Sequence, residues 1–215
     1  SFYTKFSAGP SAVLDTLQDY NQPLSLPLPI KAITKHFKNI RLIPYSKQMK
    51  RRGLSYEEML DFTGTDDACT DYDAKSGLYI IYYNDCDPSR TDTRRYRWNI
   101  VHELGHVRLG HHKNNPDSRL YRNRLSESVY KALEAEADMF AAYILVPHIV
   151  LNCLEVTEDF EIAQLCQISD TASLYRANDI KLWKKRGKVL KYDFLVLSHF
   201  FEYVESKHNN EQVHM

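Results

Sequence analysis

Hydrophobic positions in the first half of the chain occur in short runs that predict β-strands. Residues 39–45 and 78–83 are rich in Ile, Leu and Tyr, and the second run lies between Ser76-Gly77 and Asn84-Asp85. Pro44 should end the first strand or place it at an edge. A weaker strand is expected at residues 68–72. Together these runs predict a small sheet, in which 78–83 is either an edge strand or a buried one.

A helical period dominates other segments. Ser55 followed by Glu58 is a capping box that predicts a helix over residues 55–62. A longer helix is expected at 93–109, where Gly110 is a natural stop, and Pro147 should end another at 126–146. Shorter helices are predicted at 1–20 and 30–37. The apolar stripe of the 126–146 helix comprises Val129, Leu133, Ala137, Phe140, Ala141 and Ile144.

Three other segments are expected to lack regular structure. The three prolines of residues 23–29 predict an extended linker or an arm packed on the domain. The basic run 47–52 is interpreted as a solvated loop, and residues 111–125 as a polar loop. The end of the chain, residues 208–215, is expected to fray.

The C-terminal third predicts two helices at 157–169 and 170–183, joined by a short turn as in a helix-turn-helix. The run 192–203 is apolar and aromatic enough to pack back on the protein. Acidic residues in the first helix favour a packing or substrate-docking role over direct DNA binding, although DNA binding stays open. The residues that would contact DNA are Arg176, Lys181, Lys184, Lys185 and Arg186.

Composition narrows the class of protein. The 215 residues are 43% hydrophobic, and 28 basic residues balance 28 acidic ones, so no global charge attracts nucleic acid or an anionic membrane. Four irregularly spaced cysteines predict reduced thiols rather than a disulfide framework. The longest apolar run, 139–151, is too short to span a bilayer, and no signal peptide is recognised. A cytoplasmic protein without membrane contact is expected.

The candidate chemistry begins at His102, Glu103 and His106, which form a His-Glu-x-x-His motif inside the predicted helix 93–109. Residues four apart share one face of a helix, so both imidazoles can bind one Zn²⁺. Glu103 lies roughly 100° around the helix and can act as a general base on a water molecule. A surface helix that carries two histidines by chance is the alternative.

The 126–146 helix can complete this site. A catalytic zinc ion takes three protein ligands and leaves one position open, and Glu134 can be the third ligand. Asp138, one turn later on the same face, can accept a hydrogen bond from a liganding histidine and fix its tautomer. A solvated acidic face is the alternative for these two carboxylates.

Two other residues compete for the third ligand position. His112 lies where the metzincin pattern places its last histidine, but that pattern needs glycine at position 109, which here is Leu109. Glu136 lies roughly 200° around the helix from Glu134 and has no carboxylate four residues later. Glu134 is therefore preferred.

Residues 102–111 and 134–147 resemble the corresponding motifs of the ImmA/IrrE metallopeptidases, and the similarity extends over about residues 75–150. The resemblance implies a gluzincin-like fold and cleavage of a helix-turn-helix repressor encoded nearby, on a prophage or another mobile element. It also implies that His102, His106 and Glu134 bind zinc and that Glu103 is the catalytic acid/base.

These observations define what the structure should contain. The expected fold is α+β, with a zincin-like core at residues 1–150 and a helical region at 151–215. The expected function is that of an endopeptidase with one zinc ion and a protein substrate. A catalytically weak scaffold that binds a repressor or DNA is the alternative. The oxyanion donor is left open among Tyr143, His148 and a loop residue.

Overall fold

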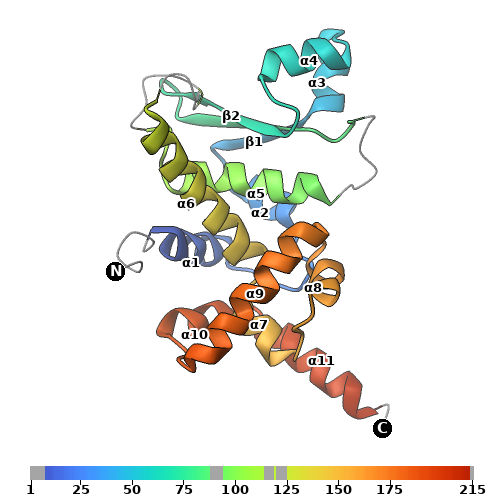
Figure 1. The fold of residues 1–215 in the computed structure, drawn as a ribbon. Helices are drawn as coiled ribbons and strands as arrows, with labels where there is room; N and C mark the ends of the chain where they lie inside the picture. The colour runs from blue at the N-terminus through green and yellow to red at the C-terminus, as the bar shows by residue number, and fades with distance from the viewer. Residues whose placement is uncertain (1–7, 88–93, 114–118, 120–124, 214–215) are drawn as a thin grey trace. The chain divides into compact units, whose positions relative to one another are not determined.

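The computed structural model describes residues 8–87, 94–113, 119 and 125–213, and it has an α+β fold with a zincin-like core (Figure 1). The chain divides into two compact units. The first, which we call the sheet unit, is Ile30–Ala141. The second, the helical unit, combines Ser1–Pro29 with Ala142–Met215.

The sheet unit contains three strands among its described residues: β1 (Ile40–Pro44), β2 (Ala68–Asp73) and β3 (Leu78–Tyr83). Strand β3 lies in the centre, parallel to β1 and antiparallel to β2. The suggestion that 78–83 is an edge strand is therefore wrong. A run that is apolar on both faces is typical of a strand covered on both sides, and its neighbours β1 and β2 form the edges.

Helices cover both faces of this sheet. Helices α3 (Tyr45–Arg52) and α4 (Tyr56–Thr63) lie on one side, where Tyr45 and Met59 form a buried cluster with Tyr82 of β3. Helices α2 (Ile30–His36) and α5 (Arg95–Arg108) lie on the opposite side (Figure 1). The predicted capping box of α4 is confirmed, because Ser55 accepts a hydrogen bond from Glu58 N and the Glu58 carboxylate accepts one from Ser55 N.

Helix α3 corrects one prediction, because residues 47–52 are helical and not a loop. Lys, Gln, Met and Arg are all good helix formers, and their charges can be solvated on a helix as well as in a loop. Gly53 ends this helix in the left-handed conformation, with φ of 69°. The four basic residues of the run are exposed, as predicted, whereas Gln48 is buried, and the charge of the run did not exclude a helix.

The helical unit has no strand among its described residues. Helices α8 (Asp159–Cys166) and α9 (Asp170–Arg186) pack against each other as the predicted pair. Helix α10 (Lys191–Ser198) contacts α1 (Ala8–Tyr20) and α7 (His148–Cys153). The arm at 23–29 is packed, since Leu24, Leu26 and Leu28 are buried and Leu24 N donates to His199 O. The last helix of this unit is α11 (Phe201–Val213).

Helix α6 (Glu127–Leu145) belongs mostly to the sheet unit and continues into the helical unit beyond Ala141. Its bounds and those of α5 confirm the two long helices that the sequence predicts. The expectation of a frayed end is wrong for residues 208–213, which continue α11. Residues 1–7, part of the loop 111–125 and residues 214–215 lie outside the described residues.

Two expectations drawn from composition can be compared with the structure. The four cysteines all lie in the described part of the chain and form no disulfide, as their irregular spacing predicts. Within the described parts of the chain, none of the helices combines the length and apolar character that a membrane span requires.

Candidate metal centre

The candidate site begins on α5, which carries His102 and His106 one helical turn apart. Their Nε2 atoms lie 3.0 Å from each other, as expected for i and i+4 positions on one face. His106 is 3% exposed and His102 is partly buried. The helix therefore directs two nitrogen donors toward one point.

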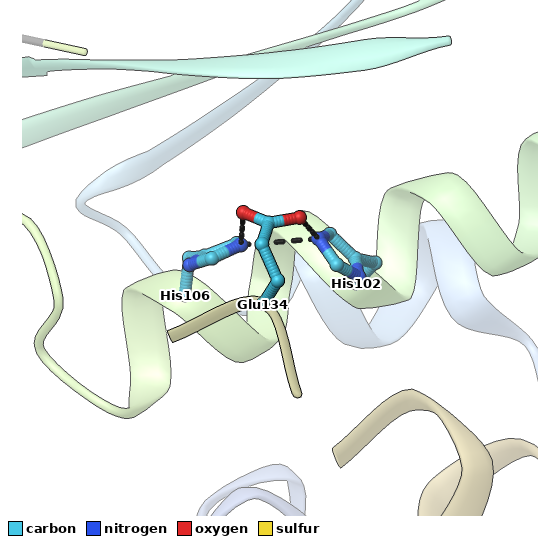
Figure 2. Close-up of side chains that lie close together, drawn as sticks. All are labelled: His102, His106 and Glu134. Carbon is cyan, nitrogen blue, oxygen red and sulfur yellow. Dashed lines mark hydrogen bonds and ion pairs between the residues drawn. The ribbon is translucent and has the colours of Figure 1, made fainter. Parts of the chain in front are cut away.

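Helix α6 adds a carboxylate at that point. One Glu134 oxygen lies 3.4 Å from His102 Nε2, and the other lies 3.4 Å from His106 Nε2. Figure 2 shows the Glu134 carboxylate between the two imidazoles, with one oxygen toward each ring. For ligands at about 2.0–2.1 Å from a tetrahedral zinc ion, the ligands themselves lie roughly 3.3 Å apart. The observed separations fit that geometry. These three residues are the one such group found among the described residues.

Gly105 allows α5 and α6 to approach each other closely. A Cβ atom at this position would lie 3.1–3.2 Å from side-chain atoms of Phe140 on α6. Such a contact is tighter than ordinary van der Waals packing, so a larger residue would push the helices apart. The absent side chain at Gly105 thus helps to bring Glu134 within reach of the histidines.

The charges at the site favour a bound cation. Burial by itself would lower the pKa of His102, but hydrogen bonds to Asp138 and Glu134 raise that pKa to about 10. Burial would raise the pKa of Glu134, but hydrogen bonds to His102 and His106 lower it instead. Both shifts have one cause, since the carboxylates stabilise positive charge among these donors. A divalent cation bound to a His₂Glu set supplies such charge.

Asp138 of α6 lies beside His102. Its Oδ1 is 2.9 Å from His102 Nδ1, the ring nitrogen that does not face Glu134. An acceptor at this position holds the proton on Nδ1 and leaves the Nε2 lone pair available. Asp138 is 59% exposed, so solvent screens this interaction.

Glu103 points to the sheet, where the Thr70 hydroxyl donates a hydrogen bond of 2.5 Å to Glu103 Oε2. Thr70 lies on β2 opposite Ile81 of β3, and it is 3% exposed. The sequence analysis did not predict that Thr70 contacts Glu103. The alternation of β2 could have placed Thr70 and Tyr72 on one face of the sheet, but not above this particular glutamate.

The two rival ligands are placed elsewhere. Glu136 Oε2 lies 3.0 Å from His111 Nε2, and His111 Nδ1 lies 2.8 Å from His106 Nδ1. His112 packs against Tyr79, and neither of its ring nitrogens has a hydrogen-bond partner among the described residues. Burial lowers the pKa of His112 to about 3 and that of His111 to about 4, so both rings are neutral at neutral pH.

The two named candidates for an oxyanion donor, Tyr143 and His148, belong to the helical unit. There His148 Nε2 lies 2.7 Å from Asp193 Oδ1, and the Tyr143 ring packs edge-on against the His148 ring. Both side chains thus take part in packing within that unit.

Fold and site together define a metallopeptidase-like α+β protein, in which two histidines and a glutamate form a candidate metal site beside a second glutamate. A family model for peptidase M78, described as the IrrE N-terminal-like domain, matches residues 57–178. Because this match covers more than half of the chain, the protein belongs to the ImmA/IrrE family of metallopeptidases. A search of curated proteins found no match to this chain.

Proposed function

We propose that this protein is a zinc-dependent endopeptidase, in which His102, His106 and Glu134 hold one Zn²⁺ and Glu103 is the catalytic acid/base. The observation that supports this best is the convergence of three donor side chains at separations of 3.0 and 3.4 Å. Family membership supports the reaction class. Other divalent ions such as Mn²⁺, Fe²⁺ or Co²⁺ bind the same types of ligand. The identity of the metal as zinc is therefore itself part of the proposal.

Each residue of the site has its own role in hydrolysis. When bound, Zn²⁺ is a Lewis acid that polarises the scissile carbonyl and lowers the pKa of a water molecule to about 7. Glu103 accepts the proton of the attacking water and delivers it to the leaving nitrogen. The Thr70 hydroxyl holds the carboxylate of Glu103 in place, and Asp138 orients His102.

An extended peptide is the substrate form that suits the sheet. Strand β2 is an edge strand within the described residues, and it carries Thr70, which contacts Glu103. A substrate segment added along β2 by main-chain hydrogen bonds would therefore run next to the catalytic glutamate. The resemblance to ImmA/IrrE proteins suggests a helix-turn-helix repressor as the protein cleaved, in the cytoplasm. The protein would then act as an anti-repressor.

The decisive variant is Glu103→Gln. We expect it to bind one zinc ion per chain, as the parent does, while cleavage of a helix-turn-helix repressor encoded by a neighbouring gene falls by roughly 10²- to 10⁴-fold. Metal content and gel analysis of the repressor measure the two effects. Removal of zinc by a chelator should also stop cleavage by the parent, and added zinc should restore it.

The same variant separates hydrolysis from a scaffold role. If Glu103→Gln relieved repression in cells as well as the parent does, the protein would act by binding its partner and not by cleaving it. Intact repressor in those cells would support the same conclusion.

A further inference from the structure

We propose that His111 and Glu136 are positioning residues that hold His106 in the tautomer required of a metal ligand. The three side chains form one hydrogen-bonded chain, from His106 Nδ1 to His111 Nδ1 at 2.8 Å and from His111 Nε2 to Glu136 Oε2 at 3.0 Å. This inference rests on the proposed metal site. It gives a role to His111 and Glu136, neither of which is among the proposed metal ligands.

The end of α5 explains how His111 reaches His106. Gly110 adopts φ of 74°, His111 N donates to His106 O at 3.0 Å, and Gly110 N donates to Val107 O at 3.1 Å. These two bonds form a Schellman motif, which brings the side chains at the positions called C″ and C3 into contact. That contact is frequently apolar. Here His111 and His106 occupy these positions, so the contact is a hydrogen bond between two buried rings.

The direction of the hydrogen bonds follows from the chemistry of the groups. A neutral imidazole has one donor and one acceptor nitrogen, whereas a carboxylate only accepts. Glu136 therefore requires the proton of His111 on Nε2, which leaves His111 Nδ1 as an acceptor. His106 must then donate from Nδ1, and its Nε2 lone pair faces His102 and Glu134. The reverse arrangement would turn the lone pair of His111 Nε2 toward a carboxylate.

The hydrogen bonds that His111 makes are more deeply buried than the hydrogen bond between Asp138 and His102. The side chain of His111 is 5% exposed, whereas that of Asp138 is 59% exposed. Buried hydrogen bonds are weakened less by solvent than exposed ones. Glu136 also lies two residues after Glu134, so α6 supplies both a ligand for the metal and the carboxylate that anchors His111. The loss of His111 should therefore weaken metal binding more than the loss of Asp138.

The test is zinc affinity, measured by competition with a chromophoric chelator, in variants that separate the acceptor atom from ring packing. His111→Phe keeps a ring but removes the acceptor, and we expect a 10- to 100-fold loss of affinity. His111→Asn keeps an acceptor at the δ position and should stay within a few-fold of the parent. The matched control is His112→Phe, because His112 is 1% exposed and packs near His106, and its ring nitrogens make no hydrogen bond to any described residue. It should bind zinc like the parent.

A second pair of variants is available if His111→Phe does not fold. Glu136 is 30% exposed, so its substitution should be tolerated. Glu136→Ala should weaken zinc binding several-fold, while Glu136→Gln keeps an acceptor oxygen and should retain the parental affinity. In ¹⁵N-histidine NMR spectra of the parent, we expect the proton of His106 on Nδ1 and that of His111 on Nε2.

The outcomes separate this inference from the function on which it rests. If the parent binds no zinc, the proposed metal site is wrong. If the parent binds zinc and His111→Phe binds it equally well, the site stands and the positioning role is wrong. Equal losses in His111→Phe and His111→Asn would also overturn the role, since ring shape and not the acceptor would then be what matters.

Discussion

Each unit contains a histidine paired with a carboxylate, His102 with Asp138 in the sheet unit and His148 with Asp193 in the helical unit, but of these two pairs only the first belongs to a candidate metal site. In the helical unit, His148 lies 2.7 Å from Asp193, and the two residues are 7% and 1% exposed. In the sheet unit, His102 lies 2.9 Å from Asp138 and 3.4 Å from Glu134. The short contact distances alone do not distinguish the two histidine–carboxylate pairs.

The difference lies in what else the groups bind. Asp193 Oδ2 already accepts a hydrogen bond from Leu190 N at 2.7 Å, and the His148 ring packs against Trp183 with centroids 4.7 Å apart. Burial lowers the pKa of His148 even though Asp193 opposes the shift. His102 instead faces two carboxylates and the Nε2 atom of a second histidine, and its pKa is raised to about 10. Donor atoms that converge on one point, and not a histidine and carboxylate pair as such, mark a metal site.

The largest expected effect that tests this comparison is loss of metal from Glu134→Ala. Two histidines remain in that variant, so zinc affinity should fall by more than the roughly 10- to 100-fold typical of residues outside the ligand set. Metal analysis after dialysis against micromolar zinc measures it. Asp193→Ala is the control from the helical unit and should keep its zinc. Full occupancy in Glu134→Ala would show that this carboxylate is not a ligand.

Thr70→Val should affect catalysis without affecting metal binding. The variant keeps the shape of the side chain but removes the hydrogen bond to Glu103, so kcat should drop roughly 10-fold while zinc affinity stays the same. Steady-state cleavage of the substrate and chelator competition measure the two. Thr34→Val is a matched control, because Thr34 is equally buried but donates only to the backbone of Ile30. An equal loss in both variants would point to a general packing effect.

Asp193→Ala should act on stability alone. Removal of this buried acceptor leaves His148 Nε2 and Leu190 N without their partner, at a cost of about 1–3 kcal/mol in the free energy of unfolding. Urea denaturation measures the loss. Asp15→Ala serves as control, since Asp15 is exposed on α1 of the same unit and its change should cost no more than about 0.5 kcal/mol. A stable Asp193→Ala protein that no longer binds zinc would contradict the distinction between the two sites.

The smallest effect expected is a pH dependence from His148. Because its pKa is lower in the folded protein than the ordinary value of 6.5, the unfolded chain binds more protons in the range between the two. Stability is therefore full above about pH 6.5 and falls as the pH drops toward the lowered pKa. Thermal unfolding of metal-free protein should show a shallower loss in His148→Phe than in the parent. The groups around His148 are Asp193, Arg176, Asp179, Tyr143 and Trp183.

Local sequence signals predicted much of the fold. The capping box at Ser55, the stop at Gly110 and the end at Pro147 placed helices α4, α5 and α6 to within a few residues. Where a prediction was wrong, two structures shared one local pattern. The charged run of α3 suits a loop or a helix, and the apolar run of β3 suits an edge strand or a central one. Only neighbours distant in sequence separate these possibilities.

Sequence alone determined which residue types were available and that His102 and His106 share a face, because the period of a helix is a local property of the backbone. The tertiary structure decided that Glu134 faces them, that Thr70 contacts Glu103 and that Glu136 pairs with His111. Each of these contacts depends on how α5 packs against α6 and β2. That packing is set by buried surfaces such as the close approach of Gly105 and Phe140, which no spacing in the sequence reports.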